Sequence, residues 1–384
     1  MRLGRLTFVL ACVTSGCATT TTSGAVSSVP AITPVPVTTS VAPTQAITFA
    51  FTGDILPHTP LINQAKRTAI ANSTAETKLD YDFRPMFLDI KSLVSDVDLA
   101  VCHLETPIAP EGEELSTFPL FGVPKEITTA IADAGFDRCS TASNHTYDRG
   151  NDGIDATINA LEDAGIEQSG MARTPDEIEP HVVEVNGIKL CHLSYTFSYN
   201  GLIMPDETQW RSAIINTKRI LHDAKRAREL GSQATIVSMH WGTEKDSKAN
   251  SMQTSIADEL TASGLVDLIV GHHAHVVQPT SQVNGVWVMY GLGNVLSNLP
   301  TDKRWPINSQ DAVIATTSLT INLAGKAVFD KPVMHPTWVD KNNGWVIRDV
   351  QKNLRSPTIS PGLTRELELS LGRTTQVLGD YITK

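Results

Sequence analysis

The segment LVDLIVGHHAH, residues 265–275, joins an apolar run to a cluster of histidines and indicates both the fold and the site. The run of residues 265–270 is short and rich in Leu, Ile and Val, which predicts a buried strand. On extended backbone, His273 and His275 point to one side and His272 to the other. Because a histidine cluster at the end of a strand has little structural purpose, the segment predicts a sheet with a site at its edge.

Four other segments share this pattern of an apolar strand followed by potential metal ligands. They are residues 53–58 (GDILPH), 103–107 (HLETP), 143–148 (SNHTYD) and 239–244 (MHWGTE). Seven of the 11 histidines fall in the five segments. Ligands of open α/β sheets bind outside the carboxyl ends of the strands, so we expect these segments to converge on one site.

Each segment alone has a structural alternative. An aspartate after a strand, such as Asp54, often forms a turn or caps a helix. His240, after an apolar strand, is by itself equally typical of a hydrogen-bonded core group. Pro57 disfavours a regular helix, so His58 is expected in a loop. The five segments together favour a shared metal site over coincidence.

From residue 46 onward the chain alternates strand-like and helix-like segments. Two hairpins are expected, at residues 181–195 around Asn186-Gly187 and at 276–290 around Asn284-Gly285. Other strands are expected at residues 46–53, 98–103, 138–142, 234–239 and 312–323. Helices are expected at residues 85–95, 125–134, 153–164, 217–230, 253–263 and 363–371. This order predicts an α/β fold whose sheet is partly parallel.

The composition is that of an ordinary globular protein. Of 384 residues, 41% are apolar and 19% are charged, and 31 basic against 41 acidic residues give a net charge of −10. The surplus of acid argues against a nucleic-acid partner. No run approaches the roughly 18 apolar residues of a membrane-spanning helix, which excludes a multi-span membrane protein.

Residues 1–17 read as an export signal. Arg2 and Arg5 precede the apolar residues 6–13, and the small residues 14–16 precede Cys17, an arrangement that resembles the bacterial lipobox. We therefore expect lipidation at Cys17 and an extracytoplasmic protein held on the cell membrane by a lipid anchor; the alternative is an ordinary signal peptide cut elsewhere. Residues 18–45, rich in Thr, Ser, Val, Pro and Ala and without charge, predict a disordered linker to a domain at 46–384.

Three cysteines follow the expected linker: Cys102, Cys139 and Cys191. Export would permit a disulfide, and the odd number leaves at least one thiol unpaired. All three lie in apolar, strand-like contexts, which favours buried small hydrophobic residues over a disulfide. No CxxC pair indicates zinc or redox chemistry.

The mixture of carboxylate, imidazole and amide groups suits divalent ions such as Mn, Fe or Zn better than calcium. With so many candidates, two ions bridged by a carboxylate or carboxamide are an option. Such a pair would hold a hydroxide and bind the oxygens of a phosphate or carbonyl under attack. A histidine beside the ions would then protonate the leaving group.

The motifs GD-x-x-x-H, LETP, NH-x-x-D-x-G, HWG-x-E, GHH-x-H and YGLGN occur in this order. Over roughly residues 46–299 they resemble the bacterial CapA family of poly-γ-glutamate capsule synthesis proteins. That family is similar to the calcineurin-like metallophosphatases, which implies a metal-bearing β-sandwich flanked by helices (αββα). Matched by motif, the implied metal ligands are Asp54, His58, Glu105, Asn144, His240, His273 and His275.

The resemblance also implies roles for the neighbours of these ligands. His145 resembles the histidine that serves metallophosphatases as acid or substrate clamp. The residues expected to support the ligands are His272, Glu244, Asn294 and Asp148. Three features depart from the phosphatase pattern: three residues separate Asp54 from His58, Glu105 stands where phosphatases carry aspartate, and His103 replaces a common asparagine.

Three functions are compatible with these observations. The first is a metal-dependent hydrolase in the synthesis, processing or export of a capsule or envelope polymer such as poly-γ-glutamate. The second is a non-enzymatic capsule assembly or polymer-binding factor, working with the capsule synthesis machinery. The third is a general metallophosphoesterase. An acidic domain repels a polyanion, so its metals or local basic residues must provide the contact with an anionic polymer.

Overall fold

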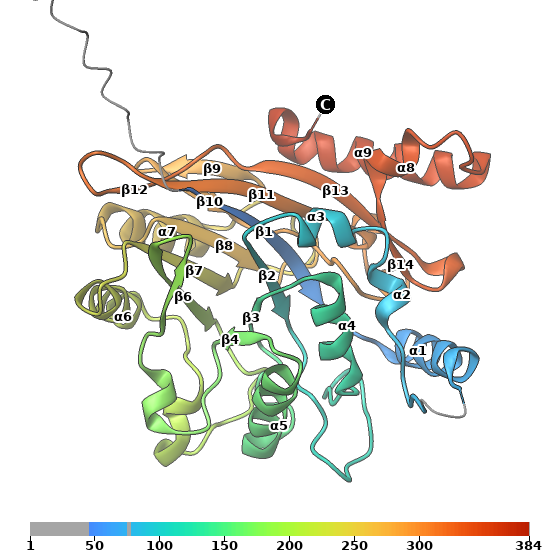
Figure 1. Ribbon diagram of the computed structural model, residues 1–384, viewed down its shortest axis with the longest axis horizontal. Helices are drawn as coiled ribbons and strands as arrows, with labels where there is room; N and C mark the ends of the chain where they lie inside the picture. The colour runs from blue at the N-terminus through green and yellow to red at the C-terminus, as the bar shows by residue number, and fades with distance from the viewer. Residues whose placement is uncertain (1–45, 75–77, 384) are drawn as a thin grey trace, which may run out of the picture. The chain divides into compact units, whose positions relative to one another are not determined.

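Two β-sheets lie face to face in the computed structural model, which describes residues 46–74 and 78–383 (Figure 1). The first sheet has the order β14-β13-β11-β1-β2-β3-β4, with β12 paired to β11. Its strands are β1 (Ala46–Ile55), β2 (Leu99–Leu104), β3 (Arg138–Ser140), β4 (Glu167–Ser169), β11 (Asp311–Ile321), β12 (Ala327–Phe329), β13 (Val333–Asp340) and β14 (Val346–Asp349). Strands β1 to β4 are parallel, whereas β11 to β14 are antiparallel to their neighbours.

The second sheet has the order β5-β6-β7-β8-β10-β9. Its strands are β5 (Val182–Val185), β6 (Ile188–Thr196), β7 (Ala234–His240), β8 (Leu268–His272), β9 (Thr280–Val283) and β10 (Val286–Met289). Strands β6, β7, β8 and β10 are parallel, and the two hairpin strands β5 and β9 close the edges. In Figure 1 the arrowheads of β1 and β2 point to the same side of the molecule as those of β6 and β7.

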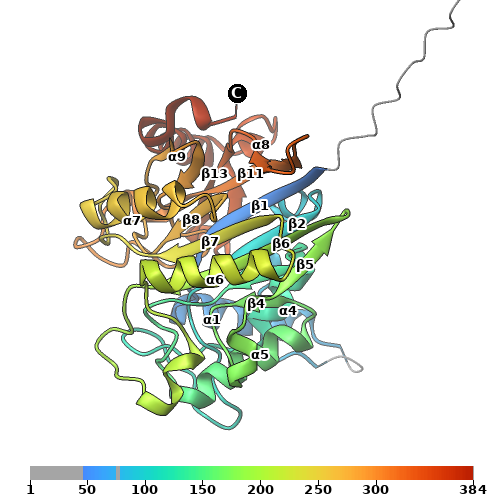
Figure 2. The ribbon, with the colours of Figure 1, turned by 90° about the vertical axis from the view of Figure 1, so that its left-hand side faces the viewer.

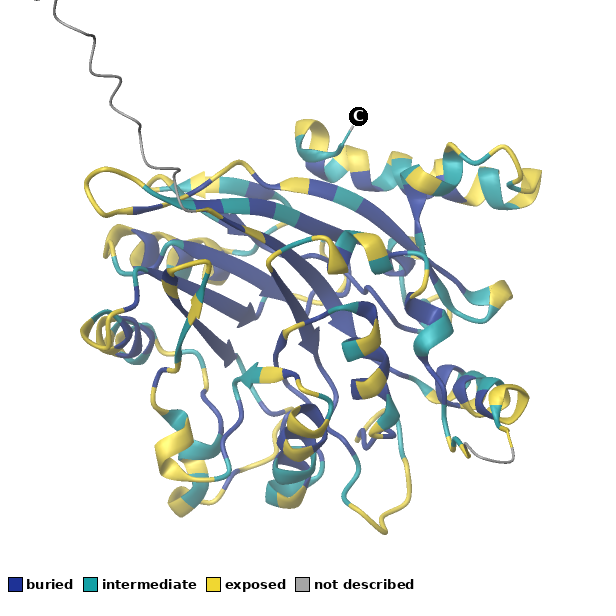
Figure 3. Cartoon of the chain, in the orientation of Figure 1, coloured by how far each residue is buried: buried dark blue, intermediate teal, exposed yellow. Residues whose placement is uncertain are grey.

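Alternation along β1 explains why the sheets stack. Phe49 and Phe51 pack against residues of β6, β7 and β8 between the sheets, whereas Ala50 faces the helices on the other side. This is the two-residue period of a strand buried on both faces. A register shift between Phe51 and Asp54 brings Ile55 to the helix side as well. Figure 3 shows the result: buried residues run along the central strands, and exposed residues lie on the outer faces of the helices.

Helices cover the outer face of each sheet (Figure 2). Those on the first sheet are α1 (Thr59–Asn72), α2 (Arg84–Phe87), α3 (Lys91–Ser95), α4 (Glu126–Ala134) and α5 (Gly150–Asp163). On the second sheet lie α6 (Thr217–Glu229) and α7 (Ser251–Ala262), while α8 (Val350–Leu354) and α9 (Pro361–Leu378) pack near β13. Short 3-10 helices are η1 (Pro175–Ile178), η2 (Asp206–Arg211), η3 (Ile307–Gln310), η4 (Lys341–Asn343) and η5 (Gly379–Tyr381). The predicted αββα sandwich is confirmed.

Both expected hairpins form. Asn186 and Asn284 adopt φ of 49° and 51°, and the glycine after each also has a positive φ, as a two-residue hairpin turn requires. The expected helix at residues 85–95 is instead divided into α2 and α3, and α9 is longer than the predicted residues 363–371.

As predicted, residues 56–58 around Pro57 are not helical, and His58 has an extended backbone with φ of −78° and ψ of 165°. Helix α1 begins at Thr59, directly after His58, and contains Pro60 in its first turn. Proline is tolerated there because the first amide groups of a helix have no partner within it. His58 is therefore presented from the loop that leads into α1 rather than from a helical face, which confirms the prediction.

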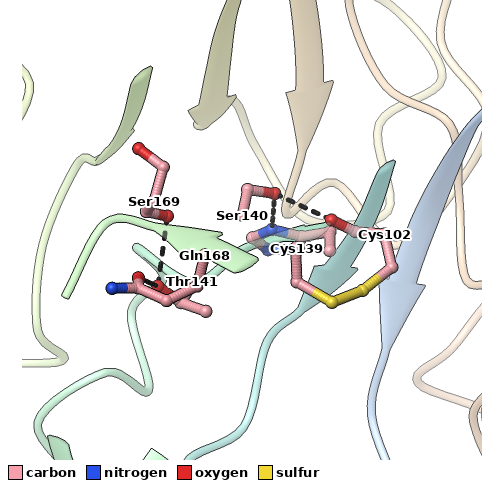
Figure 4. The surroundings of a disulfide bond; sticks show 7 residues. Cys102, Cys139, Ser140, Thr141, Gln168 and Ser169 are labelled. Carbon is pink, nitrogen blue, oxygen red and sulfur yellow. Dashed lines mark hydrogen bonds between the residues drawn. A yellow bond between two sulfur atoms is a disulfide. The ribbon is translucent and has the colours of Figure 1, made fainter. Parts of the chain in front are cut away.

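A disulfide joins Cys102 of β2 to Cys139 of β3 (Figure 4). The two cysteines are direct partners in the register of these parallel strands. The interpretation as unpaired hydrophobic residues is therefore wrong for this pair and confirmed for Cys191, which is a buried free thiol.

The predicted export signal, Cys17 and the linker at 18–45 lie outside the residues that the structure describes and stay predictions. Within residues 46–74 and 78–383, no helix combines the length and apolar character needed to cross a membrane.

Candidate metal centre

The carboxyl ends of strands from both sheets supply the site. Asp54 lies at the end of β1, Glu105 directly follows β2, and Asn144 follows β3. From the second sheet come His240, which ends β7, and the segment 272–275 at the end of β8. Donor atoms from four of the five segments lie close together in groups that could hold an ion, and Asn144 of the fifth contacts His240, so the strand ends meet at one place.

A close approach of two backbones positions Asp54. The Asp54 amide donates to the carbonyl oxygen of Gly293, in the connection from β10 to β11, at 2.9 Å. A Cβ atom on the preceding Gly53 would lie 2.0 Å from that same oxygen. Only glycine fits at residue 53, which explains the GD pair that opens the first motif.

Glu105 is the most unusual residue of the site. Its side chain is 0% exposed, and neither carboxylate oxygen has a hydrogen-bond partner among the described residues. Its Oε1 lies 3.7 Å from Nε2 of His275, whose Nδ1 lies 3.4 Å from Oδ2 of Asp54. A buried carboxylate without hydrogen bonds is costly, so this arrangement fits a bound cation.

The electrostatics of this group agree with a cation site. Burial raises the pKa of Glu105 well above its ordinary value. Burial also opposes the charge of Asp54, yet His272 and His275, each with Nδ1 3.4 Å from an oxygen of Asp54, bring the pKa of Asp54 below its usual range. Burial lowers the pKa of His275, but Glu105 and Asp54 raise it overall to about 10. A divalent ion bound by the three side chains would take the place of the proton on His275.

Asn144, His240 and His273 form a second cluster of donors. Oδ1 of Asn144 lies 2.8 Å from Nε2 of His240, and the rings of His240 and His273 are 4.7 Å apart. Burial, reinforced by neighbouring histidines, lowers the pKa of His240 well below its usual value and that of His273 to about 3. Neutral imidazoles and an amide oxygen are suitable ligands for a transition metal.

The backbone of residues 273–275 differs from the prediction. His273 and His275 have φ of 86° and 57°, so the backbone here is left-handed rather than extended. As a result His272 does not point away from the site: its Nδ1 lies 3.4 Å from Oδ1 of Asp54. Left-handed residues other than glycine are unfavourable and cluster at functional sites.

His58 lies at the edge of the site. Its Nδ1 accepts a hydrogen bond from the Asn298 amide at 3.3 Å, and its ring packs edge-on against Phe121. Burial lowers its pKa to about 4. The structure does not place His58 in any of the close groups of metal-type donors found among the described residues, so its role as a ligand stays a prediction.

His145 is held by a carboxylate. Its Nδ1 lies 2.7 Å from Oδ2 of Asp148, which also accepts a 2.7 Å hydrogen bond from the Phe121 amide. The His145 ring lines a cleft of about 310 Å³ together with His58 and His275. This fixed orientation suits the predicted acid or clamp.

The other supporting residues also lie beside the ligands. Asn294 places Oδ1 2.8 Å from Nδ1 of His275 and donates to the His275 and Ser309 carbonyl oxygens. Glu244 forms a close donor group with His273 and His275.

The remainder of the cleft is aromatic and basic. Its other side chains include Phe118, Phe121, Trp305, Lys245 and Arg304. The Lys245 ammonium lies 4.3 Å from the centre of the Trp305 ring, a cation–π contact that holds it at the rim. Sequence reasoning missed these residues because no repeated spacing links them to the motifs.

The sequence places His103 in the second segment of potential ligands but assigns it no role beyond a departure from the family pattern. His103 lies on β2, two residues before Glu105, so on extended backbone the two side chains point to the same side. This spacing is the signal that could have identified it. Its Nε2 lies 2.9 Å from Nδ1 of His240.

The fold is that of a two-sheet α/β protein, and its buried donor groups could hold a metal ion. The chain belongs to the family of bacterial capsule synthesis protein PGA_cap, whose model matches residues 48–299. The predicted CapA resemblance is thereby confirmed.

Two relatives illustrate the match. The capsule biosynthesis protein CapA of Bacillus anthracis is 28% identical over 210 residues, covering 54% of this chain and 49% of that protein. The PGA biosynthesis protein CapA of Bacillus subtilis (strain 168) is 26% identical over 213 residues, covering 53% and 52%. The chain thus spans about half the length of these curated relatives.

Solved structures with a similar fold include a phosphatase from Mycoplasma pneumoniae, with a TM-score of 0.47, 13% identity and coverage of 84% of this chain and 97% of that one. A calcineurin-like phosphoesterase from Bacillus subtilis has a TM-score of 0.45 at 12% identity, covering 87% and 99%.

Proposed function

We propose that this protein is a metal-dependent hydrolase, exported and lipid-anchored, that acts on a capsule or envelope polymer such as poly-γ-glutamate. The observation that carries the proposal is Glu105, a fully buried carboxylate with no hydrogen-bond partner among the described residues and with Asp54 and His275 beside it. Such a group is stable when a cation binds it, and it lies next to an open cleft.

Two ions fit the donors best. Asp54, Glu105 and His275 would hold one divalent transition metal, and Asn144, His240 and His273 would hold another. When bound, such ions supply an activated water and polarise the carbonyl or phosphoryl group under attack. Mn, Fe and Zn are all compatible with this mixture of carboxylate, imidazole and amide donors.

His145 supplies the proton for the leaving group. Asp148 accepts a hydrogen bond at Nδ1 of His145 and stabilises the charged ring, so the other nitrogen, Nε2, donates to the leaving amine or alcohol. The same carboxylate is fixed by the Phe121 amide, which keeps the ring in one orientation.

The cleft suits an anionic chain. The whole protein carries a net charge of −10 and repels a polyanion, but Lys245 places positive charge at the rim of the cleft, where Arg304 is paired with Asp302. The aromatic walls formed by Phe118, Phe121 and Trp305 would contact the methylene groups of the polymer.

The printed names of the relatives favour a second candidate. They describe capsule and PGA biosynthesis rather than hydrolysis. In that case the metal centre binds carboxylates of the polymer without cleaving it, and the protein serves the synthesis machinery as an assembly factor.

One assay separates these candidates. The metal-loaded protein is incubated with poly-γ-glutamate and, separately, with phosphoesters, and Glu105→Gln is compared with Glu126→Gln, a half-buried glutamate on α4. The hydrolase predicts polymer cleavage that falls by more than about 100-fold in Glu105→Gln only. Metal-dependent binding without cleavage identifies the assembly factor, and turnover of phosphoesters alone identifies a general phosphoesterase.

The lipid anchor has its own test. Cell fractionation should find the wild-type protein with the membrane and Cys17→Ala in the soluble extracytoplasmic fraction. Equal membrane association of the two proteins contradicts the anchor but leaves the hydrolase untouched.

A further inference from the structure

A row of four hydrogen-bonding contacts leads from the second cluster of donors into the space between the sheets. Oδ1 of Asn144 lies 2.8 Å from Nε2 of His240, and Nδ1 of His240 lies 2.9 Å from Nε2 of His103. Nδ1 of His103 lies 2.8 Å from Oγ of Ser140. The row ends at the Cys102 carbonyl oxygen, 3.3 Å from the Ser140 hydroxyl, as Figure 4 shows.

The members of this row have no freedom to choose other partners. His103, Ser140 and His240 are completely buried. The His103 ring is stacked on His272 with 3.9 Å between ring centres and 12° between planes, which fixes its orientation. Burial favours neutral imidazoles, so each ring carries one proton, and the position of that proton decides which way every bond in the row runs.

The distances allow two directions. In the first, the Ser140 hydroxyl donates to His103 Nδ1, His103 Nε2 donates to His240 Nδ1, and His240 Nε2 donates to Asn144 Oδ1. In the second, His240 Nδ1 donates to His103 Nε2, His103 Nδ1 donates to Ser140 Oγ, and the Ser140 hydroxyl donates to the Cys102 carbonyl oxygen. Each ring keeps one proton and Ser140 keeps its hydroxyl hydrogen in both, so the exchange involves no net gain or loss of protons.

Only the second direction leaves ligands for an ion. It exposes the lone pair of His240 Nε2 and releases Oδ1 of Asn144, whereas the first consumes both in one hydrogen bond. We propose that His103 and Ser140 are positioning residues of the metal centre: they hold His240 in the tautomer that binds through Nε2, and ion binding selects the second direction. This inference rests on the proposed metal centre and assigns a purpose to the histidine at residue 103.

A second serine–histidine pair provides an internal control. Oγ of Ser238 on β7 lies 2.8 Å from Nε2 of His192 on β6, and both side chains are buried. The other ring nitrogen of His192, Nδ1, has no partner among the described residues, so this pair leads to no candidate ligand. Removing either serine hydroxyl perturbs a similar buried hydrogen bond, but only Ser140 is connected to His240.

The first experiment measures metal affinity. Zn²⁺ is titrated into the full-length, metal-free protein by calorimetry for the wild type, Ser140→Ala, His103→Leu, His103→Gln and Ser238→Ala. We expect His103→Leu to weaken the affinity by about 10–100-fold and Ser140→Ala by about 10-fold. Ser238→Ala should stay within about twofold of the wild type, and His103→Gln, which keeps an acceptor for His240 Nδ1–H, should recover part of the loss.

The second experiment reads the proton positions directly. Long-range ¹H–¹⁵N spectra of the histidine rings distinguish a proton on Nδ1 from one on Nε2. In the Zn²⁺-loaded protein, His240 and His103 should both carry the proton on Nδ1. His103→Leu is used only if its amide spectrum shows a folded protein; otherwise Ser140→Ala and His103→Gln provide the comparison.

The outcomes separate this inference from the proposed function. Unchanged affinity in Ser140→Ala and both His103 variants, or a proton on Nε2 of His240 in the Zn²⁺-loaded protein, overturns the positioning role alone. A wild-type protein that binds no divalent ion overturns the metal centre and the positioning role with it.

Discussion

Glu105 and Asp311 are both buried carboxylates, but Asp311 has an arginine partner within the fold and Glu105 lies at the candidate metal centre. Asp311, at the start of β11, is 1% exposed and accepts two hydrogen bonds from Arg373 of α9, at 2.5 and 2.7 Å. Glu105 is 0% exposed and receives no hydrogen bond from any described residue. The chain supplies a hydrogen-bonded arginine where the carboxylate stabilises the fold, whereas the cation nearest to Glu105 is His275, 3.7 Å away and without a hydrogen bond to it. The predictions below test that difference.

Removing Arg373, the partner of Asp311, should cause the largest loss of stability. Arg373→Met leaves Asp311 buried beside an apolar side chain and should reduce the free energy of unfolding by about 4 kcal/mol. Denaturant titration with and without divalent metal measures this loss, which should be equal under both conditions. A loss below about 1 kcal/mol would show that Asp311 does not depend on its arginine.

The disulfide between Cys102 and Cys139 should stabilise the strands beside the site, as the pair of Asp311 and Arg373 stabilises the fold elsewhere. It closes a loop of 37 residues and joins β2, which leads into Glu105, to β3. The double variant Cys102→Ala with Cys139→Ala should lose about 3 kcal/mol of stability. Cys191→Ala serves as the control for removal of a buried sulfur, and equal losses in the two proteins would contradict a stabilising disulfide.

A bound metal ion should stabilise the folded protein only through Glu105, the carboxylate without a hydrogen-bond partner among the described residues. At a free ion concentration of 100 times Kd, the wild type should gain about 2.7 kcal/mol, and a chelator should remove the gain. Glu105→Gln should lose this increment, whereas Asp311→Asn should retain it despite a lower starting stability. An increment that survives in Glu105→Gln places the ion elsewhere.

Lys245 should show the smallest effect. Lys245→Met removes the ammonium held over Trp305 and should raise the KM for an anionic polymer about fivefold, near 1 kcal/mol, with kcat unchanged. Lys303→Met, an exposed lysine in the neighbouring loop, should leave both constants unchanged. A fall in kcat rather than a rise in KM would mean that Lys245 acts in the chemical step.

The motifs predicted the site because each strand end is a local feature of the sequence and these ends meet at one edge of the fold. Asp54, Glu105, Asn144 and His240 each follow an apolar run, and parallel strands bring such positions to one edge. The turn chemistry of Asn284-Gly285 is equally local, so both hairpins could be predicted from two residues each.

Other features depend on contacts that no local pattern records. His103 and His240 are 137 residues apart and meet only because the two sheets stack. The left-handed backbone at His273 reflects the packing around the site rather than its own preference. The pairing of Cys102 with Cys139 likewise depends on the register of β2 and β3, which the sequence does not specify.

The metal content of the purified protein tests the central claim most directly. Elemental analysis should find about one to two divalent transition-metal ions per chain in the wild type and in Asp311→Asn, and almost none in Glu105→Gln. A folded wild-type protein that retains no such ion after incubation with Mn²⁺, Fe²⁺ or Zn²⁺, or a Glu105→Gln variant with full occupancy, would contradict the account.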